Sequence, residues 1–292
     1  MHLIMKTIDK VSILCILALA FSCGQKDEPA PVKPEPQPET QQPLPIVTLH
    51  GKSCFELTTR DTVPIIDDTY MDVENEFTIN WPSLDSFPPA TRRALIRMAF
   101  ADSTSPTLRQ AGQRFLAQTW VDDDDWEILG RRPIDSVLHW PTNNATLVGD
   151  MTDFGTLMQF SVHSEYNVAF AAHGTYYSNN LLVDRSTGAV VSLADLMDTT
   201  HLGQLLLRAL EEVPLNHDNG NTTECLFDEY KSCLPQPDGF SLDSTCSVIT
   251  AYFNIYTVQS YACGMLFVDM PVSWLDAQAV LTPYGKKVFR LE

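Results

Sequence analysis

Residues 169–197 constrain the fold most, because strand and turn signals alternate closely along them before a helix begins. Residues 178–180 (Ser-Asn-Asn) predict one turn, since asparagine tolerates left-handed backbone. Residues 186–188 (Ser-Thr-Gly) predict a second turn, because glycine adopts positive φ freely. Ser192 and Asp195 have the spacing of a capping box at a helix N-terminus. Hairpins that lead into a helix indicate an α+β fold, mostly antiparallel sheet packed with a few helices.

Short apolar runs continue this mixed pattern on both sides of the stretch. Strands are predicted at residues 46–50, 55–57, 77–82, 157–162, 166–170, 240–242, 247–253 and 265–270. Helices are predicted at residues 92–101, 106–120, 193–198, 201–213 and 274–281, with Thr91 before the first, Ser105 capping the second and Ser273 capping the last. We therefore expect an N-terminal α+β region at residues 46–160 and a C-terminal α+β domain at residues 161–292.

The N-terminus has the pattern of a bacterial lipoprotein signal. Two lysines precede an apolar run at residues 11–21, which is too short for a comfortable membrane span and suits a signal-peptide core. Ala20 and Ser22 before Cys23 resemble a lipobox, in which the signal (residues 1–22) is removed and the cysteine is acylated. We expect Cys23 to be the lipid attachment site; the alternative is an ordinary secreted protein.

Residues 23–45 are predicted to be a lipidated cysteine followed by a tether. Residues 24–28 form a short charged cluster that resembles the signal exporting some lipoproteins to the outer face of the outer membrane. Residues 29–45 are dense in proline with glutamate and glutamine, a composition that favours extended polyproline-type chain over a buried core. We expect a lipid anchor in the outer membrane and a domain facing the cell exterior, with the periplasmic face as the alternative.

The charge of the chain restricts its partners. The 292 residues carry a formal net charge of −18. Removal of residues 1–22 would take away two basic and one acidic side chain and leave −19. A surface this acidic repels the phosphates of nucleic acids, and we therefore expect no nucleic-acid partner. It attracts cationic partners, although solubility alone also explains it.

Common catalytic motifs are missing from the sequence. There is no HExxH zinc motif, no GxSxG nucleophile elbow, no P-loop and no HxxxH pair. We therefore expect no enzyme activity, no catalytic residue, no cofactor and no metal.

Two groups of residues in the sequence are candidates for metal sites. Residues 122–125 are four consecutive aspartates, but calcium loops alternate their ligands and include glycine, so a solvated loop is favoured. His139, His163 and His173 with Glu165 lack any spacing typical of zinc. His173 precedes a glycine, and a ring hydrogen-bonded to nearby backbone is the simpler interpretation.

The cysteine count leaves an odd thiol. Of the seven cysteines, one leaves with the signal and Cys23 is lipidated; those that remain are Cys54, Cys225, Cys233, Cys246 and Cys263. An extracytoplasmic compartment permits disulfides. Cys225 and Cys233 flank a short polar excursion, and we predict that they form a bridge.

The C-terminal half resembles a known extracytoplasmic domain. The residues that carry the likeness are 172–174 (Ala-His-Gly), Asp184, the turn at 187–188, the helix start at 192–197, and Tyr252, Tyr256, Tyr261, Ala262 and Gly264. Together they resemble the C-terminal domain shared by RsiV-type lysozyme-binding anti-sigma factors and the non-catalytic part of PdaC-type peptidoglycan deacetylases. The likeness covers residues 165–282 well and residues 50–160 in outline, through residues 77–80.

Two positions depart from the resembled pattern. The family has a glutamate where Thr257 stands and a proline where Ser260 stands, which places any ligand role of that glutamate in doubt. An anti-sigma factor also needs a cytoplasmic segment and a spanning helix. This sequence begins instead with a signal peptide, and we expect no sigma factor as partner.

The resemblance implies a binding module for a cationic protein such as lysozyme, or for a cell-wall glycan such as peptidoglycan. The candidate ligand-binding residues are His173, Tyr176, Tyr177, Tyr256 and Tyr261. The alternatives are a cell-wall hydrolase or deacetylase accessory whose site is not recognised, and a purely structural lipoprotein.

Overall fold

The computed structural model describes residues 43–58, 70–120, 143–167 and 173–291, which belong to one compact unit. The six strands of the first sheet are, in spatial order, β1 (Ile46–Thr58), β2 (Tyr70–Pro82), β3 (Asn143–Asp153), β4 (Leu157–Asn167), β5 (Thr175–Asp184) and β6 (Val190–Val191). The second sheet is β7 (Gly239–Leu242), β8 (Val248–Phe253) and β9 (Leu266–Pro271). Neighbouring strands are antiparallel except for β2 and β3. The predicted class, α+β with mostly antiparallel sheet, is confirmed.

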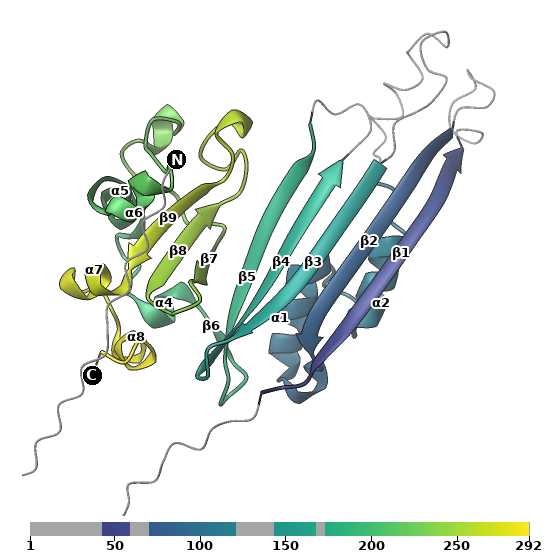
Figure 1. Cartoon of the computed structure of the whole chain (residues 1–292), viewed down its shortest axis with the longest axis horizontal. Helices are drawn as coiled ribbons and strands as arrows, with labels where there is room; N and C mark the ends of the chain where they lie inside the picture. The colour runs from purple at the N-terminus through teal and green to yellow at the C-terminus, as the bar shows by residue number, and fades with distance from the viewer. Residues whose placement is uncertain (1–42, 59–69, 121–142, 168–172, 292) are drawn as a thin grey trace, which may run out of the picture. The chain divides into compact units, whose positions relative to one another are not determined.

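The α-helices in the described ranges are α1 (Pro89–Phe100), α2 (Leu108–Leu116), α4 (Leu193–Leu196), α5 (Leu202–Glu212), α6 (Pro214–Asp218), α7 (Val272–Ala277) and α8 (Pro283–Val288). Short 3-10 turns lie at Leu84–Ser86, Asp228–Tyr230 and Tyr261–Cys263. A parallel pair of strands requires a crossover connection, and α1 and α2 belong to the one between β2 and β3. Both helices pack against the same face of the first sheet (Figure 1).

Two hydrophobic cores meet at β5. Val183 is buried in the core beneath α1, in the same cluster as the rings of Trp81 and Phe160. Its neighbour Leu182 is buried in the other core, with Leu206 of α5 and the inner residues of β8 and β9. Successive side chains of a strand point to opposite faces, so β5 contributes to both cores. The sheet does not divide at residue 160, where the sequence placed a domain boundary, because β4 pairs with β3 on one side and β5 on the other.

Residues 178–180 do not form the predicted turn, because β5 continues straight through them. The N–H of Ser178 donates to Asn254 Oδ1 at 3.0 Å, and the N–H of Asn180 donates to the hydroxyl oxygen of Tyr252 at 2.8 Å. These bonds from the second sheet satisfy backbone donors that a turn would have left to solvent. A Cβ at Gly239 would lie 2.1 Å from the same hydroxyl oxygen, so this approach requires glycine.

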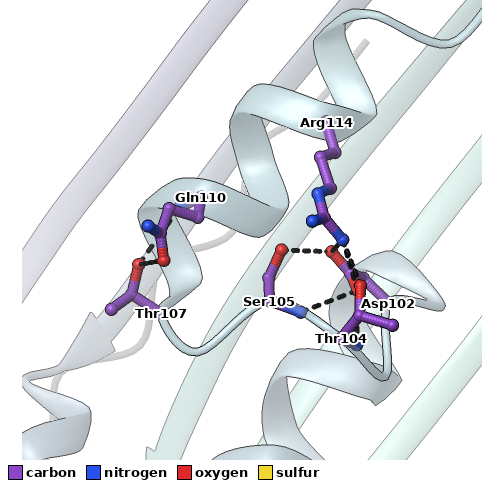
Figure 2. A network of polar contacts seen from close by, with 6 residues as sticks. All are labelled: Asp102, Thr104, Ser105, Thr107, Gln110 and Arg114. Atoms are coloured by element: carbon purple, nitrogen blue, oxygen red, sulfur yellow. Dashed lines mark hydrogen bonds and ion pairs between the residues drawn. The ribbon is translucent and has the colours of Figure 1, made fainter.

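Asp102 accepts hydrogen bonds that stabilise the connection between α1 and α2 (Figure 2). These bonds explain why the helix cap predicted at Ser105 does not form. The hydroxyl of Ser105 donates to the Asp102 carboxylate and therefore does not cap α2 as predicted. Thr107 takes that role, its hydroxyl accepting from the N–H of Gln110 at 3.3 Å. Hydrogen bonds from Ser105 and Thr104 lower the pKa of Asp102.

Among the other predicted helix starts, one agrees with the structure and two differ from it. The capping box of Ser192 and Asp195 is confirmed at the start of α4. Thr91 lies inside α1, where its hydroxyl donates to the Gly188 carbonyl at 2.6 Å. The helix predicted to be capped by Ser273 begins instead at Val272, with Pro271 in the N-cap position, so Ser273 lies inside its first turn.

The predicted turn at residues 186–188 is confirmed and is organised by Asp184. The Asp184 carboxylate accepts from the N–H groups of Ser186 and Thr187, both at 2.9 Å, and Gly188 has φ 68°. The hydroxyl of Tyr284 in α8 donates to the other carboxylate oxygen at 2.9 Å. Burial raises the pKa of Asp184, but hydrogen bonds from Ser186, Thr187 and Tyr284 outweigh it and bring the pKa to about 2.

Replacing Asp184 by asparagine is expected to lower the free energy of unfolding at pH 7 by about 1 kcal/mol or more, since hydrogen bonds to a charged acceptor are lost. The pKa of Asp184 is about 2 in the folded state. In the unfolded state it is about 3.9. The unfolded state therefore binds more protons in this window, and the contribution of Asp184 is lost as pH falls from about 4 to about 2.

Urea unfolding of wild type and Asp184→Asn between pH 2 and pH 7 measures this difference, with the exposed Asp218→Asn as the matched control. The stability gap between wild type and Asp184→Asn should narrow in acid. An unchanged gap across the whole pH range would contradict the role given to this carboxylate.

Candidate functional site

Four of the predicted ligand-binding residues lie together on the surface and form an aromatic patch: His173, Tyr176, Tyr256 and Tyr261. The His173 ring stacks on Tyr261, with ring centroids 3.5 Å apart and an interplanar angle of 13°. Tyr176 meets the edge of Tyr261 at 6.2 Å between centroids. Tyr256 is 53% exposed and Tyr176 is 37% exposed, so the patch presents aromatic surface to solvent.

The two nitrogens of His173 have different partners. Nδ1 lies 3.1 Å from the carbonyl oxygen of Gly174, as the sequence predicted for a ring bonded to nearby backbone. A carbonyl only accepts, so Nδ1 carries the proton of this bond. Nε2 lies 2.8 Å from the hydroxyl of Tyr256, which donates to it when the ring is neutral. The imidazole thus connects the start of β5 to the β8–β9 connection.

Tyr256 is held in place by a tight turn at the end of β8. The N–H of Thr257 donates to the Asn254 carbonyl at 3.1 Å, and the N–H of Asn254 and the hydroxyl of Thr257 donate to Asp238 at 2.6 Å and 2.8 Å. Tyr256 itself has φ 64°, a left-handed conformation that is strained for a bulky residue. Strained backbone concentrates at sites where surrounding contacts impose it, and here it turns the ring toward His173.

Tyr261 is supported by a disulfide and a buried amide. Its 3-10 turn ends at Cys263, which is bonded to Cys225. The side-chain amide of Gln259, which is 3% exposed, donates to the carbonyls of Cys263 and Gly264 at 3.1 Å and 3.3 Å. These contacts fix the loop below the ring.

The predicted bridge between Cys225 and Cys233 is wrong, since Cys225 pairs with Cys263. Residues 225–227 run antiparallel beside residues 258–260, through the bridge of Leu226 with Gln259 and a 3.0 Å bond from the Phe227 N–H to the Val258 carbonyl. This pairing brings the two distant cysteines together. The free cysteines among the described residues are Cys54, Cys233 and Cys246. Burial raises the pKa of Cys246 to about 11.

Tyr177 does not belong to the aromatic patch. It follows Tyr176 in β5 and therefore points to the opposite face of the sheet, where its ring lies 6.1 Å from that of Tyr166. Trp120 continues this second group, 4.8 Å from Tyr166. Trp120 and Tyr166 were not among the site residues predicted from the sequence. The spacing of Ser164 and Tyr166 along β4 could have indicated that they share one face of the sheet.

The candidate metal residues do not come together within the part of the chain that is described. His163 Nδ1 lies 2.7 Å from the Ser178 hydroxyl. The described ranges hold no group of three or more His, Cys, Asp or Glu side chains placed to bind a metal ion. None of the helices in these ranges is both long and apolar enough to cross a membrane. Cys23, His139 and the aspartates at residues 122–125 lie outside the described residues.

Comparison with known proteins identifies the fold. No family model matches the sequence, and no curated protein matches it. A DUF3298 family protein from Bacteroides fragilis NCTC 9343 has a similar structure, with a TM-score of 0.54 and 15% identity over 83% of this chain and 96% of its own. The chain has the fold of a DUF3298 family member. Another, from Pseudomonas aeruginosa PAO1, is 16% identical over 83% of this chain and 96% of its own, with a TM-score of 0.48.

Replacing Cys263 by serine is expected to lower the free energy of unfolding by about 2–4 kcal/mol, because the disulfide restricts the unfolded chain. Cys225→Ser should have the same effect, while Cys233→Ser should change stability little. Denaturant unfolding measures the three variants. Peptide mapping without reduction should recover a cross-linked peptide pair containing Cys225 and Cys263; recovery of Cys225 with Cys233 would contradict the structure.

Proposed function

We propose that this chain is a non-catalytic envelope lipoprotein that binds a cationic protein, such as lysozyme, through the aromatic patch. The observation that carries the proposal is the meeting of His173 and Tyr176 with Tyr256 and Tyr261 on one exposed surface. Tyrosine is over-represented among the residues that dominate binding energy at protein interfaces.

The support beneath the patch favours tight binding. The disulfide of Cys263 and the turn that Asp238 holds fix the β8–β9 connection, which carries Tyr256 and Tyr261, before a partner arrives. A surface ordered in advance loses less side-chain and loop entropy on association. The patch is thus suited to act as a rigid contact surface.

The charge of the chain favours a basic partner. A formal net charge of −18 creates a negative potential that speeds the approach of a cationic protein and weakens as salt screens it. The aromatic patch supplies short-range contact and the acidic surface supplies long-range attraction. These two contributions are separable by experiment, because only the second depends strongly on ionic strength.

The resemblance to the lysozyme-binding domain of RsiV-type proteins supports the same class of ligand. This chain has Thr257 where the resembled family has a glutamate. The Thr257 hydroxyl donates to Asp238 and closes the turn that presents Tyr256. The contact we propose therefore uses the tyrosine rings and not a carboxylate at position 257. A cell-wall glycan is the alternative ligand at the patch.

The soluble domain is expected to bind lysozyme with an affinity that falls as salt rises, measured by titration calorimetry between 50 and 300 mM salt. Tyr256→Ala and Tyr261→Ala should each weaken binding about tenfold or more at fixed salt, because they remove aromatic contact area. They should leave the salt dependence unchanged, because neither alters charge.

The matched control is Phe267→Ala, which removes an exposed aromatic ring from β9 and should leave lysozyme binding unchanged. Cytochrome c serves as a basic protein of unrelated surface. Absence of lysozyme binding at low salt would contradict the proposal. Equal binding of cytochrome c together with no loss in Tyr256→Ala would show attraction by charge alone and would also contradict it.

We further propose that Cys23 is acylated and anchors the domain in the outer membrane, facing the exterior, or the periplasm as the alternative. Cys23→Ser is expected to abolish labelling by radioactive palmitate and to move the protein from the membrane fraction to the soluble fraction. Cys54→Ser is the control and should keep both label and membrane association. Labelling that persists in Cys23→Ser would refute this anchor.

A further inference from the structure

The helix-covered face of the first sheet, opposite to the aromatic patch, carries a hollow lined by aromatic rings. The hollow measures about 440 Å³ and opens between the C-terminal end of α1 and strands β4 and β5. Its volume falls in the range of pockets that hold small molecules. We name it the ring pocket; the residues that characterise it are Trp120, Tyr166, Tyr177, Ser164, Thr175 and Asn179.

Aromatic rings form one wall of the ring pocket. Trp120, Tyr166 and Tyr177 follow one another in edge contacts, with centroid separations of 4.8 Å and 6.1 Å. The indole N–H of Trp120 donates to Oδ1 of Asn75 at 2.6 Å, and the fully buried Asn75 in turn donates to the carbonyls of Leu116 and Gln118. The tryptophan ring is therefore oriented by the protein itself.

Neutral polar groups stand beside these rings. Thr175 and Asn179 alternate with Tyr177 on the same face of β5, and their side chains make no hydrogen bond within the described structure. Among the described residues that line the ring pocket, none is Asp, Glu, Lys, Arg or His, although the chain carries a net charge of −18. Burial raises the pKa of Tyr166, so its phenol stays neutral.

We infer that the ring pocket binds a neutral sugar ring. The apolar face of a pyranose fits against aromatic side chains, and its hydroxyl groups match the unpaired amide and hydroxyl of Asn179 and Thr175. A charged ligand would find no opposite charge among the described lining residues and would lose hydration there without compensation. A purely apolar ligand would bury Asn179 and Thr175 without partners.

A neighbouring hollow extends the site along the sheet. It measures about 360 Å³ and shares Ala101, Trp120 and Tyr166 with the ring pocket. At its far side Arg114 is paired with Asp102 and hydrogen-bonded to Thr104 (Figure 2), so these charges are already satisfied. The shared tryptophan and tyrosine place two subsites side by side, which suits an oligosaccharide of two or more neutral rings.

This inference does not rest on the proposed binding of a cationic protein. Tyr176 and Tyr177 point to opposite faces of β5, so the aromatic patch and the ring pocket are separate surfaces. Loss of one function by mutation is therefore expected without loss of the other.

Titration calorimetry of the full chain with two neutral probes tests the inference. The probes are a tetramer of N-acetylglucosamine and cellotetraose, which separate N-acetylated amino-sugar chains from plain hexose chains as the source of the ligand. At least one should bind, and Tyr177→Ala and Asn179→Ala should each weaken that binding about tenfold or more. Both side chains are partly exposed, and thermal unfolding of the variants verifies that they fold. Phe267→Ala is the matched control.

Three outcomes would overturn the inference. The first is that neither tetrasaccharide binds the folded protein. The second is that binding persists unchanged in Tyr177→Ala and Asn179→Ala. The third is that binding is lost in Tyr256→Ala and kept in Tyr177→Ala, which would place the sugar on the aromatic patch instead.

Discussion

The hydrogen bonds that join β5 to the second sheet are the constraint on which the rest of the structure depends. Backbone donors of Ser178 and Asn180 meet Asn254 and Tyr252, and burial keeps the Tyr252 phenol neutral by raising its pKa. Gln159 of β4 forms a second connection between the two sheets, since its buried amide donates to and accepts from the backbone of Leu242 in β7. Buried polar groups without such partners would be strongly destabilising, so the two sheets are fixed to one another.

The connection between β5 and the second sheet also positions the aromatic patch and the ring pocket. Asn254 begins the turn that presents Tyr256, so the residue that accepts from β5 also starts the loop that faces His173. The aromatic patch therefore forms only where the second sheet docks on β5. On the other face, the same strand supplies Tyr177 and Asn179 to the ring pocket, beneath α1 and Trp120. A single strand with alternating side chains thus serves two surfaces of different chemistry.

Turns and helix caps were predicted correctly where the hydrogen bonds that form them lie within a few neighbouring residues. The turn after Asp184 and the capping box of Ser192 satisfy their donors within a few residues, so their spacing is readable from sequence. The turn predicted at residues 178–180 failed because Asn254 and Tyr252, more than 70 residues away, supply acceptors that stabilise extended backbone there. Ser105 failed as a cap because Asp102 competes for its hydroxyl.

The sequence by itself determined the α+β class, most strands and the hydrogen bond of His173 to nearby backbone, and it singled out Tyr176, Tyr256 and Tyr261. Only the tertiary structure decided that Tyr261 stacks on His173, that Tyr177 belongs with Trp120 and Tyr166, and that Cys225 pairs with Cys263. The physical reason is distance along the chain. Periodicity and capping report interactions within a turn or a strand, whereas these contacts depend on how sheets and loops dock.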